Sequence, residues 1–306
     1  MNILMPHIAS RLFGEPLLVD AGKLAAILIG IGGRVVEGGL EMPGGVEAVD
    51  HWAFSGGRPS LGRVGDPLGN RYEQAGVGNR LLQRVGNVGV IAIEGTLVHK
   101  GKFVGQSSGE TSYEGLQAQV LRAQRDPEIK GVVFEVDSFG GEAAGGFETS
   151  RLMAELSRQK PTLAILTDFA LSAGYLLASA ARQIVMPETG AAGSIGVMTV
   201  HADISKQLAD RGIKVTLISS GAHKVDGHSA APLPDEVRAR IQSRVDATRD
   251  LFAEVVAENR GARLTKAQAL ATEARVYHGQ EAVAAGLVDG IVDSQIAFKA
   301  FVKQLN

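Results

Sequence analysis

The sequence predicts an α/β protein with a mainly parallel sheet covered by helices on both faces. Short apolar runs alternate with amphipathic stretches from residue 88 onward. Three of the six runs end at a glycine, proline or aspartate, which are typical residues at strand ends. Repeated strand–helix alternation favours parallel strands joined by helical crossovers. The chain has 306 residues, of which 45% are hydrophobic, so it is long enough to bury a substantial core.

The expected strands are apolar runs of six to eight residues that are rich in Val and Ile. They lie at residues 88–95, 131–136, 161–168, 182–187, 194–200 and 214–219. Such runs are typical of strands whose two faces are both covered.

The expected helices fill the intervals between these runs. Residues 112–126 place Leu116, Val120 and Ala123 on one helical face, and residues 143–159 and 172–181 follow the next two strands. Residues 203–212 begin with an N-capping Asp203 and end at Gly212. A long amphipathic helix is expected at 235–258, shorter ones at 265–273 and 279–285, and another at the end of the chain.

Residues 1–85 differ in composition from the remainder and are expected to form an N-terminal arm. Its first part, MPHIASRLFGEPLLVDAGKLAAIL, is compatible with one or two short helices. Residues 55–80 are dense in Gly, Arg and Pro, which is typical of a linker. Residues 86–306 are expected to form the main folded domain, with a C-terminal helical segment.

Composition excludes several classes of function. The net charge is −2 with acids and bases mixed, which gives no reason to expect nucleic acid as a partner. There are no cysteines, so disulfides and thiolate metal sites are excluded. The early apolar stretch at 24–31 is too short to span a bilayer, and no basic segment precedes an apolar core as in a signal peptide. We therefore expect a soluble, cytoplasmic protein without a transmembrane segment.

Ser172 is the candidate nucleophile. It stands between an expected strand and a helix of small residues, in the run TDFALSAGYLLASAA. The structural alternative is a simple N-cap, because serine is favoured there. In the functional reading, the positive end of the helix dipole stabilises an alkoxide or a nearby oxyanion.

The Gly140–Gly141 pair directly follows a buried strand in the run DSFGGEAAGG. It is either an ordinary glycine turn or an oxyanion hole made of backbone N–H groups. A phosphate-binding loop is disfavoured, because no G-x-x-x-x-G-K-S/T pattern is present.

Lys224 lies in a loop of small residues, LISSGAHKVDGHSAAP. A loop lysine is ordinarily solvated and without a role. A buried lysine, however, can act as a general base because desolvation favours its neutral form. The histidines at positions 201, 223, 228 and 278 are weaker candidates, because the sequence gives none of them a clear carboxylate partner.

These segments together resemble the signal peptide peptidase A family, the S49 serine peptidases, over residues 88–293. The family's A-S-G-G-Y turn matches LSAGY, its T-G-S-I/L-G-V segment matches AAGSIGV, its S-G-x-x-K loop matches SGAHK, and its S-P-G-G turn matches SFGG. The resemblance implies Ser172 as nucleophile, Lys224 as general base and Ser194 as the residue that orients Lys224. It also implies a spiral of ββα units like those of ClpP and the crotonases, and no metal or other cofactor.

Two positions depart from the family pattern. Phe139 replaces the proline of S-P-G-G, and Ala173 replaces the glycine after the nucleophile. The expected oxyanion donors, Gly140, Gly141 and Ala173, act through backbone groups, so neither change should remove the chemistry.

The opening HIASRLFGEPLLVDAGKLAAIL and the run TSYEGLQAQV resemble the phage and prophage branch of the family. That resemblance implies a homo-oligomeric head maturation protease acting on portal, scaffold or capsid proteins, in the host cytoplasm or the procapsid. The alternatives are an SppA-like peptidase that degrades signal peptides or other peptides, and an inactive capsid-assembly scaffold. A crotonase-type acyl-CoA enzyme with Glu142 as acid or base is a further alternative.

Overall fold

The computed structural model describes residues 2–3, 15–22, 24, 40–41, 82–99 and 109–305. The predicted linker at 55–80 lies outside these residues. The described strands are β1 (Asn2–Ile3), β2 (Leu17–Val19), β3 (Leu40–Glu41), β4 (Gln83–Val85), β5 (Val88–Val98), β6 (Glu110–Ser112), β7 (Gly131–Glu142), β8 (Thr162–Leu171), β9 (Gln183–Met186), β10 (Ala191–Gly193), β11 (Val276–His278) and β12 (Gly290–Ile291).

The described helices are α3 (Tyr113–Arg125), α4 (Gly146–Gln159), α5 (Ala173–Ala178), α6 (Ser205–Asp210), α7 (Asp235–Arg260), α8 (Lys266–Ala271), α9 (Gly279–Ala284) and α10 (Ser294–Leu305). None of them is both long and apolar enough to cross a membrane.

The main sheet has a parallel core that runs β5, β7, β8, with β9 and then β10 pairing the far edge of β8. Antiparallel strands β4, β2 and β11 are added at its margins. The predicted α/β class with a mainly parallel sheet is therefore confirmed.

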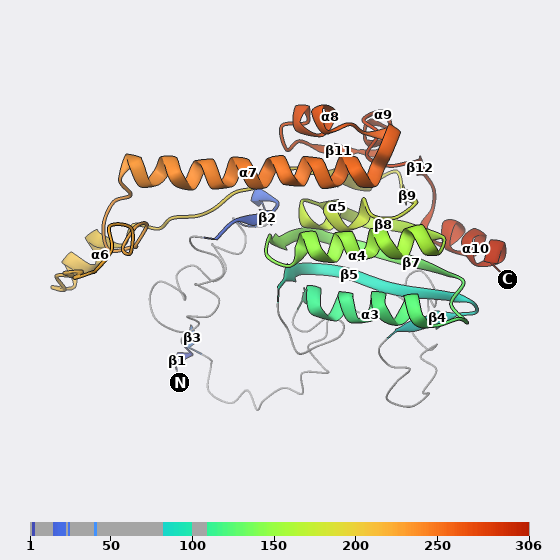
Figure 1. Ribbon diagram of the computed structural model, residues 1–306, viewed down its shortest axis with the longest axis horizontal. Coiled ribbons are helices and arrows are strands. Elements are labelled where there is room, and N and C mark those ends of the chain that lie inside the picture. The colour runs from blue at the N-terminus through green and yellow to red at the C-terminus, as the bar shows by residue number, and fades with distance from the viewer. Residues whose placement is uncertain are drawn as a thin grey trace.

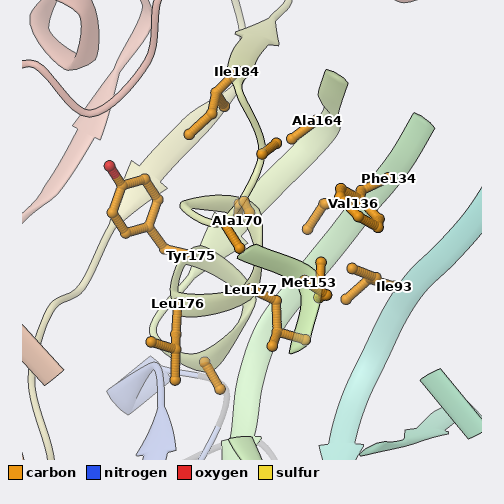
Figure 2. Close-up of a cluster of buried hydrophobic side chains, with 14 of the residues drawn as sticks. Ile93, Phe134, Val136, Met153, Ala164, Ala170, Tyr175, Leu176, Leu177 and Ile184 are labelled. Atoms are coloured by element: carbon orange, nitrogen blue, oxygen red, sulfur yellow. The ribbon is translucent and has the colours of Figure 1, made fainter. Parts of the chain in front are cut away.

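Helices cover both faces of this sheet, which explains why its strands are apolar on both sides. Helices α3, α4 and α5 bury one face in the main core, and α10 covers Val88, Val90, Val133, Leu163 and Ile165 on the other. Figure 2 shows the main core, where Tyr175, Leu176 and Leu177 of α5 gather with side chains from β5, β7 and β8. This packing places the start of α5 directly beside the end of β8.

Strand β7 is longer than predicted and includes the run that was expected to be a glycine turn. It continues to Glu142, with irregular pairing to β8 between Val136 and Ser138. The later part of β7 remains a strand because both of its edges are paired. One edge pairs with β5, and the other pairs with β2 after β8 has diverged. Strand β2, residues 17–19, lies in a stretch for which only helices were expected, so that expectation was wrong at these residues.

The predicted strands at 194–200 and 214–219 are absent from the described part of the chain. Strand β10 ends at Gly193, and residues 194–200 form only isolated bridge residues at Met198 and Val200, of which Met198 pairs antiparallel with Leu17. Residues 214–219 are exposed and irregular. An apolar run becomes a strand only where a neighbouring strand can accept its hydrogen bonds, and none lies beside 214–219 among the described residues.

Residues 201–233, which we call the arm and which are distinct from the N-terminal arm predicted at 1–85, project from the body of the molecule. Figure 1 shows them with α6 at the far left, beyond the start of α7 and well separated from α5. The arm exposes Ile213, Val215, Leu217 and Ile218, the last of them 95% exposed. Large apolar side chains clustered in this way are typical of an interaction surface.

Candidate active site

Ser172 follows β8 and precedes α5 in a strained backbone conformation. Its φ is 54° and its ψ is −119°, a region that a non-glycine residue occupies at a cost of roughly 1–3 kcal/mol. Its N–H donates to the carbonyl of Gly193 at 2.9 Å, and its own carbonyl accepts from Leu176 at 2.9 Å. A sharp strand-to-helix turn of this kind presents a nucleophilic side chain in other hydrolases.

The hydroxyl of Ser172 makes no side-chain capping bond, so the simple N-cap alternative does not describe it. The residue is fully buried, and its Oγ has no hydrogen-bond partner among the described residues. A buried hydroxyl without a partner costs about 1–3 kcal/mol. Strain and an orphaned hydroxyl at one residue are typical of a functional position.

Ser194 lies next to Ser172 because their strands pair in parallel. Leu171 at the end of β8 pairs with Gly193 at the end of β10, so both serines emerge at the same level of the sheet. Ser194 has a φ of 55° and is nearly buried, and its N–H donates to the carbonyl of Arg275 at 3.0 Å. The structure therefore brings together the two serines that the sequence separates by twenty-two positions.

The backbone of Gly140 lies close to that of Ala173, the residue after Ser172. Gly140 has a φ of 96°, and a methyl group built on it would lie 3.0 Å from the Ala173 nitrogen. The N–H of Ala173 begins a helix and so has no intrahelical acceptor. The N–H of Gly140 donates to Ser138 Oγ at 3.1 Å. Gly141 lies between β5 and β2, paired with Leu97 and Leu18.

Ser138 is a site residue that the sequence reasoning missed. It is fully buried, and its Oγ donates to the carbonyl of Gly95 at 2.7 Å while accepting from Gly140. Gly174 packs on it so closely that an added methyl group would lie 2.8 Å from the Ser138 carbonyl oxygen. The small residues after Ser172 therefore let α5 rest on the Ser138–Gly140 backbone. The available signal was the serine in SFGG, which stands two residues before Gly140.

Lys224 is not brought to Ser172 within the chain. It is exposed on the arm, in a turn where its N–H donates to the carbonyl of Gly221 at 3.2 Å. Ser172 is buried in the body of the molecule, and Figure 1 shows the two regions far apart.

His223 has a carboxylate partner that the sequence did not reveal. Its Nδ1 lies 2.9 Å from Asp226 Oδ2, and Arg240 of α7 also pairs with Asp226. This pair lies on the arm beside Lys224, so any movement that carries the lysine to a nucleophile carries the histidine with it.

Glu142, the acid or base of the crotonase alternative, holds a neighbouring loop. Its Oε2 accepts from the backbone N–H of His99 at 2.8 Å, and its carbonyl accepts from the Tyr113 hydroxyl at 2.8 Å. Burial, with the Glu142 charge nearby, raises the pKa of Tyr113 far above its ordinary value, so that hydroxyl stays a donor. These contacts give Glu142 a structural role.

Comparison with known proteins finds one matching family and two relatives that align over nearly the whole chain. The family model described as Peptidase family S49 matches residues 154–306. The chain is 38% identical over 290 residues to Capsid assembly protease C of Escherichia phage lambda, covering 95% of this chain and 64% of that protein. It is 34% identical to Head-tail preconnector protein GP5 of Enterobacteria phage P21, covering 99% of this chain and 58% of that protein. The chain thus spans about three fifths of the length of these two relatives.

More distant similarities are also found. Protease 4 of Haemophilus influenzae is 28% identical over 73% of this chain and 34% of that protein. Among solved structures, an enoyl-CoA hydratase from Shewanella pealeana aligns with a TM-score of 0.43 at 11% identity, over 76% of this chain and 78% of that one. A ClpP1 variant from Listeria monocytogenes aligns with a TM-score of 0.40 at 13% identity, over 68% and 94%. The match of the family model to the C-terminal half, together with the site motifs, shows that this chain belongs to peptidase family S49.

Proposed function

We propose that this chain is a serine endopeptidase in which Ser172 is the nucleophile and Lys224 the general base. The observation that carries the proposal is Ser172 itself. It combines a positive φ, full burial and a hydroxyl with no hydrogen-bond partner among the described residues, at the carboxyl end of a parallel strand. Ser194 stands at the same level, directly after the end of the neighbouring strand β10, where it orients the lysine amine.

The proposed reaction is acyl transfer through a covalent intermediate. The neutral amine of Lys224 accepts the proton from Ser172 Oγ, which attacks the scissile carbonyl carbon. The N–H groups of Ala173, Gly140 and Gly141 stabilise the oxyanion, and the Gly140 N–H leaves its hydrogen bond to Ser138 Oγ to do so. The protonated amine then gives its proton to the leaving nitrogen, and water hydrolyses the acyl-enzyme. No metal or other cofactor takes part.

A neighbouring copy of the chain supplies the lysine in this proposal. Lys224 is exposed on an arm that projects away from Ser172 of its own chain. The same arm exposes Ile213, Val215, Leu217 and Ile218. Packing these side chains against a second copy buries them, and it can place Lys224 beside that copy's Ser172. The active enzyme is then a homo-oligomer.

The proposed substrates are polypeptides of the phage head, namely portal, scaffold or capsid proteins. Relatives that align over nearly the whole chain are named a capsid assembly protease and a head-tail preconnector protein, which favours this class. The enzyme would act in the host cytoplasm or inside the procapsid. An SppA-like role in degrading other peptides is the alternative.

An activity-based probe tests the nucleophile. A fluorophosphonate should label the wild-type protein, and mass spectrometry should map the adduct to Ser172. The matched control is Ser172→Ala, which should not be labelled. Absence of labelling in wild type, together with equal processing of a co-expressed capsid or portal protein by wild type and Ser172→Ala, would overturn the peptidase function. Saturable acyl-CoA binding without labelling would favour the crotonase alternative.

Mixing two inactive variants tests where the lysine comes from. Ser172→Ala retains Lys224, and Lys224→Ala retains Ser172, so mixed oligomers contain complete sites only if the lysine is donated between copies. We expect the mixture to regain labelling at Ser172. A mixture that stays inactive, while wild type is labelled, would show that each chain supplies its own base.

A further inference from the structure

Strand β2 (Leu17–Val19) lies between two backbone segments that carry residues of the candidate site. On one side it pairs antiparallel with Gly140–Glu142 of β7. On the other side, the Leu17 N–H donates to the Met198 carbonyl at 2.8 Å, and the Met198 N–H donates to the Leu17 carbonyl at 3.0 Å. Met198 stands four residues after Ser194. A segment from the start of the chain thus runs extended through the middle of the site.

The carbonyl of Leu18 lies beside Gly140, one of the candidate oxyanion residues. A methyl group built on Gly140 would lie 2.0 Å from the Leu18 oxygen and 3.0 Å from the Ala173 nitrogen. A peptide carbonyl therefore already stands beside the backbone that would receive a substrate carbonyl. Ser172 is fully buried in this arrangement, so a polypeptide cannot reach its hydroxyl until some neighbour moves.

We propose that β2 is an internal inhibitory strand that occupies the groove for an extended polypeptide substrate. This inference rests on the proposed peptidase function and adds a mode of regulation to it. A substrate strand would bind by the same main-chain pairing, with Gly140–Glu142 on one edge and Met198 on the other. The chain is inactive while β2 is seated and becomes active when β2 leaves.

The side chains of β2 indicate what can replace it. Leu18 is fully buried in the main core, while Leu17 and Val19 pack in a small separate cluster with Leu24, and Met198 and Val200 border it. A competing segment therefore needs apolar side chains at successive positions of an extended strand. The gain from burying such side chains is opposed by the entropy cost of ordering the backbone, so exchange between β2 and a similar strand is feasible.

The attachments that flank β2 are modest. Glu15 pairs with Arg244 of α7 at 2.6 Å, and both side chains are more than half exposed, where ion pairs contribute little. The Asp20 N–H donates to the Phe139 carbonyl at 2.9 Å, and the Ala143 N–H donates to the Pro16 carbonyl at 3.3 Å. Short pairing with weak flanks suits a strand that can be displaced.

A reversible disulfide tests the inference, because the chain has no cysteine of its own. Leu17 and Glu142 are directly opposed antiparallel partners, a geometry that a disulfide can bridge. In the Leu17→Cys/Glu142→Cys protein, oxidation should lower the hydrolysis of fluorescein-labelled casein at least tenfold, and a reductant should restore it. Each single-cysteine variant should respond to neither treatment. Comparing oxidised and reduced forms of one protein removes any effect of the substitutions themselves.

A second pair of measurements tests the inference by weakening the pairing that holds β2 in place. Leu17→Pro lacks the N–H that bonds to Met198, so it should cleave casein several-fold faster than wild type. A peptide of residues 15–20, EPLLVD, should slow this variant, whereas a scrambled peptide should not. Equal casein rates in the oxidised and reduced double-cysteine protein would overturn the inference while leaving the peptidase function intact. If neither wild type nor Leu17→Pro is labelled by fluorophosphonate at Ser172, the peptidase function fails, and the inference fails with it.

Discussion

Arg260 at the end of α7 offers a sharp test of how the body of the molecule is held together. Its side chain is fully buried and donates to the Gly286 carbonyl at 2.9 Å and 3.1 Å. It also donates to both carboxylate oxygens of Asp289, at 2.9 Å and 3.1 Å. Asp289 in turn accepts from the Ile184 N–H at 2.7 Å. One guanidinium thus joins α7, the loop before β12, and β9.

Replacing Arg260 by methionine should destabilise the protein by about 3–5 kcal/mol, the usual cost of removing one partner of a buried ion pair. The matched control is Arg240→Met on the same helix. Arg240 is 41% exposed and pairs with Glu236 and Asp226, so its loss should cost about 0–1 kcal/mol for each of these surface pairs. Urea unfolding followed by circular dichroism measures both values. Equal losses in the two variants would refute the assignment of Arg260 as a buried anchor.

The pH dependence of the same variant gives an independent check. Partial burial by itself would raise the pKa of Asp289, but hydrogen bonds and charge from Arg260, with help from the Ile184 N–H and Arg263, outweigh it and hold this pKa below its ordinary value. A lowered folded-state pKa contributes stability that is complete above the unfolded value and is lost as pH falls through the folded value. The difference between wild type and Arg260→Met should therefore be constant from pH 5 upward and shrink below about pH 4. A difference that grows on acidification would contradict this.

Three further predictions concern the site. Ser194→Ala should fold normally and lower kcat by about 10²–10⁴-fold with little change in KM, and a change confined to KM would argue against orientation of the base. Peptidase activity should rise toward mildly alkaline pH and be lost in Lys224→Ala, because an amine is a base only when neutral. A profile rising near pH 6–7 that survives this substitution would implicate a histidine as the base instead. Gly141→Ala should lose about 3 kcal/mol in urea unfolding, the upper end of the usual cost of overpacking, because its methyl group would lie 1.9 Å from the Leu97 oxygen. Gly89→Ala, whose methyl group meets nothing closer than 3.4 Å, should stay within about 1 kcal/mol of wild type, and similar losses in both would refute the packing argument.

Most helices and core strands could be predicted because their signals are local. The apolar runs at 88–95, 131–136 and 161–168 are strands, and the helices at 112–126 and 235–258 lie within two or three residues of their expected ends. A strand that is buried on both faces needs a continuous apolar run, and a helix that is buried on one face needs apolar residues at helical spacing. Both patterns can be read directly from the sequence.

The wrong predictions share one cause, which is the dependence of a strand on a distant partner. Residues 214–219 have the composition of a strand but lie exposed on the arm, whereas residues 17–19 are a strand because β7 and Met198 lie on either side of them. Backbone hydrogen bonds between segments more than a hundred residues apart leave no local mark.

The sequence by itself determined which residues are candidates for catalysis. The order of Gly140, Ser172, Ser194 and Lys224, each next to a predicted element end, followed from local pattern and family resemblance. Only the tertiary structure decided which of them meet. Parallel pairing of β8 with β10 puts Ser172 beside Ser194, whereas the projecting arm keeps Lys224 away and β2 fills the space next to Gly140. Proximity depends on strand register and chain path, which are properties of the packed molecule rather than of any short stretch of sequence.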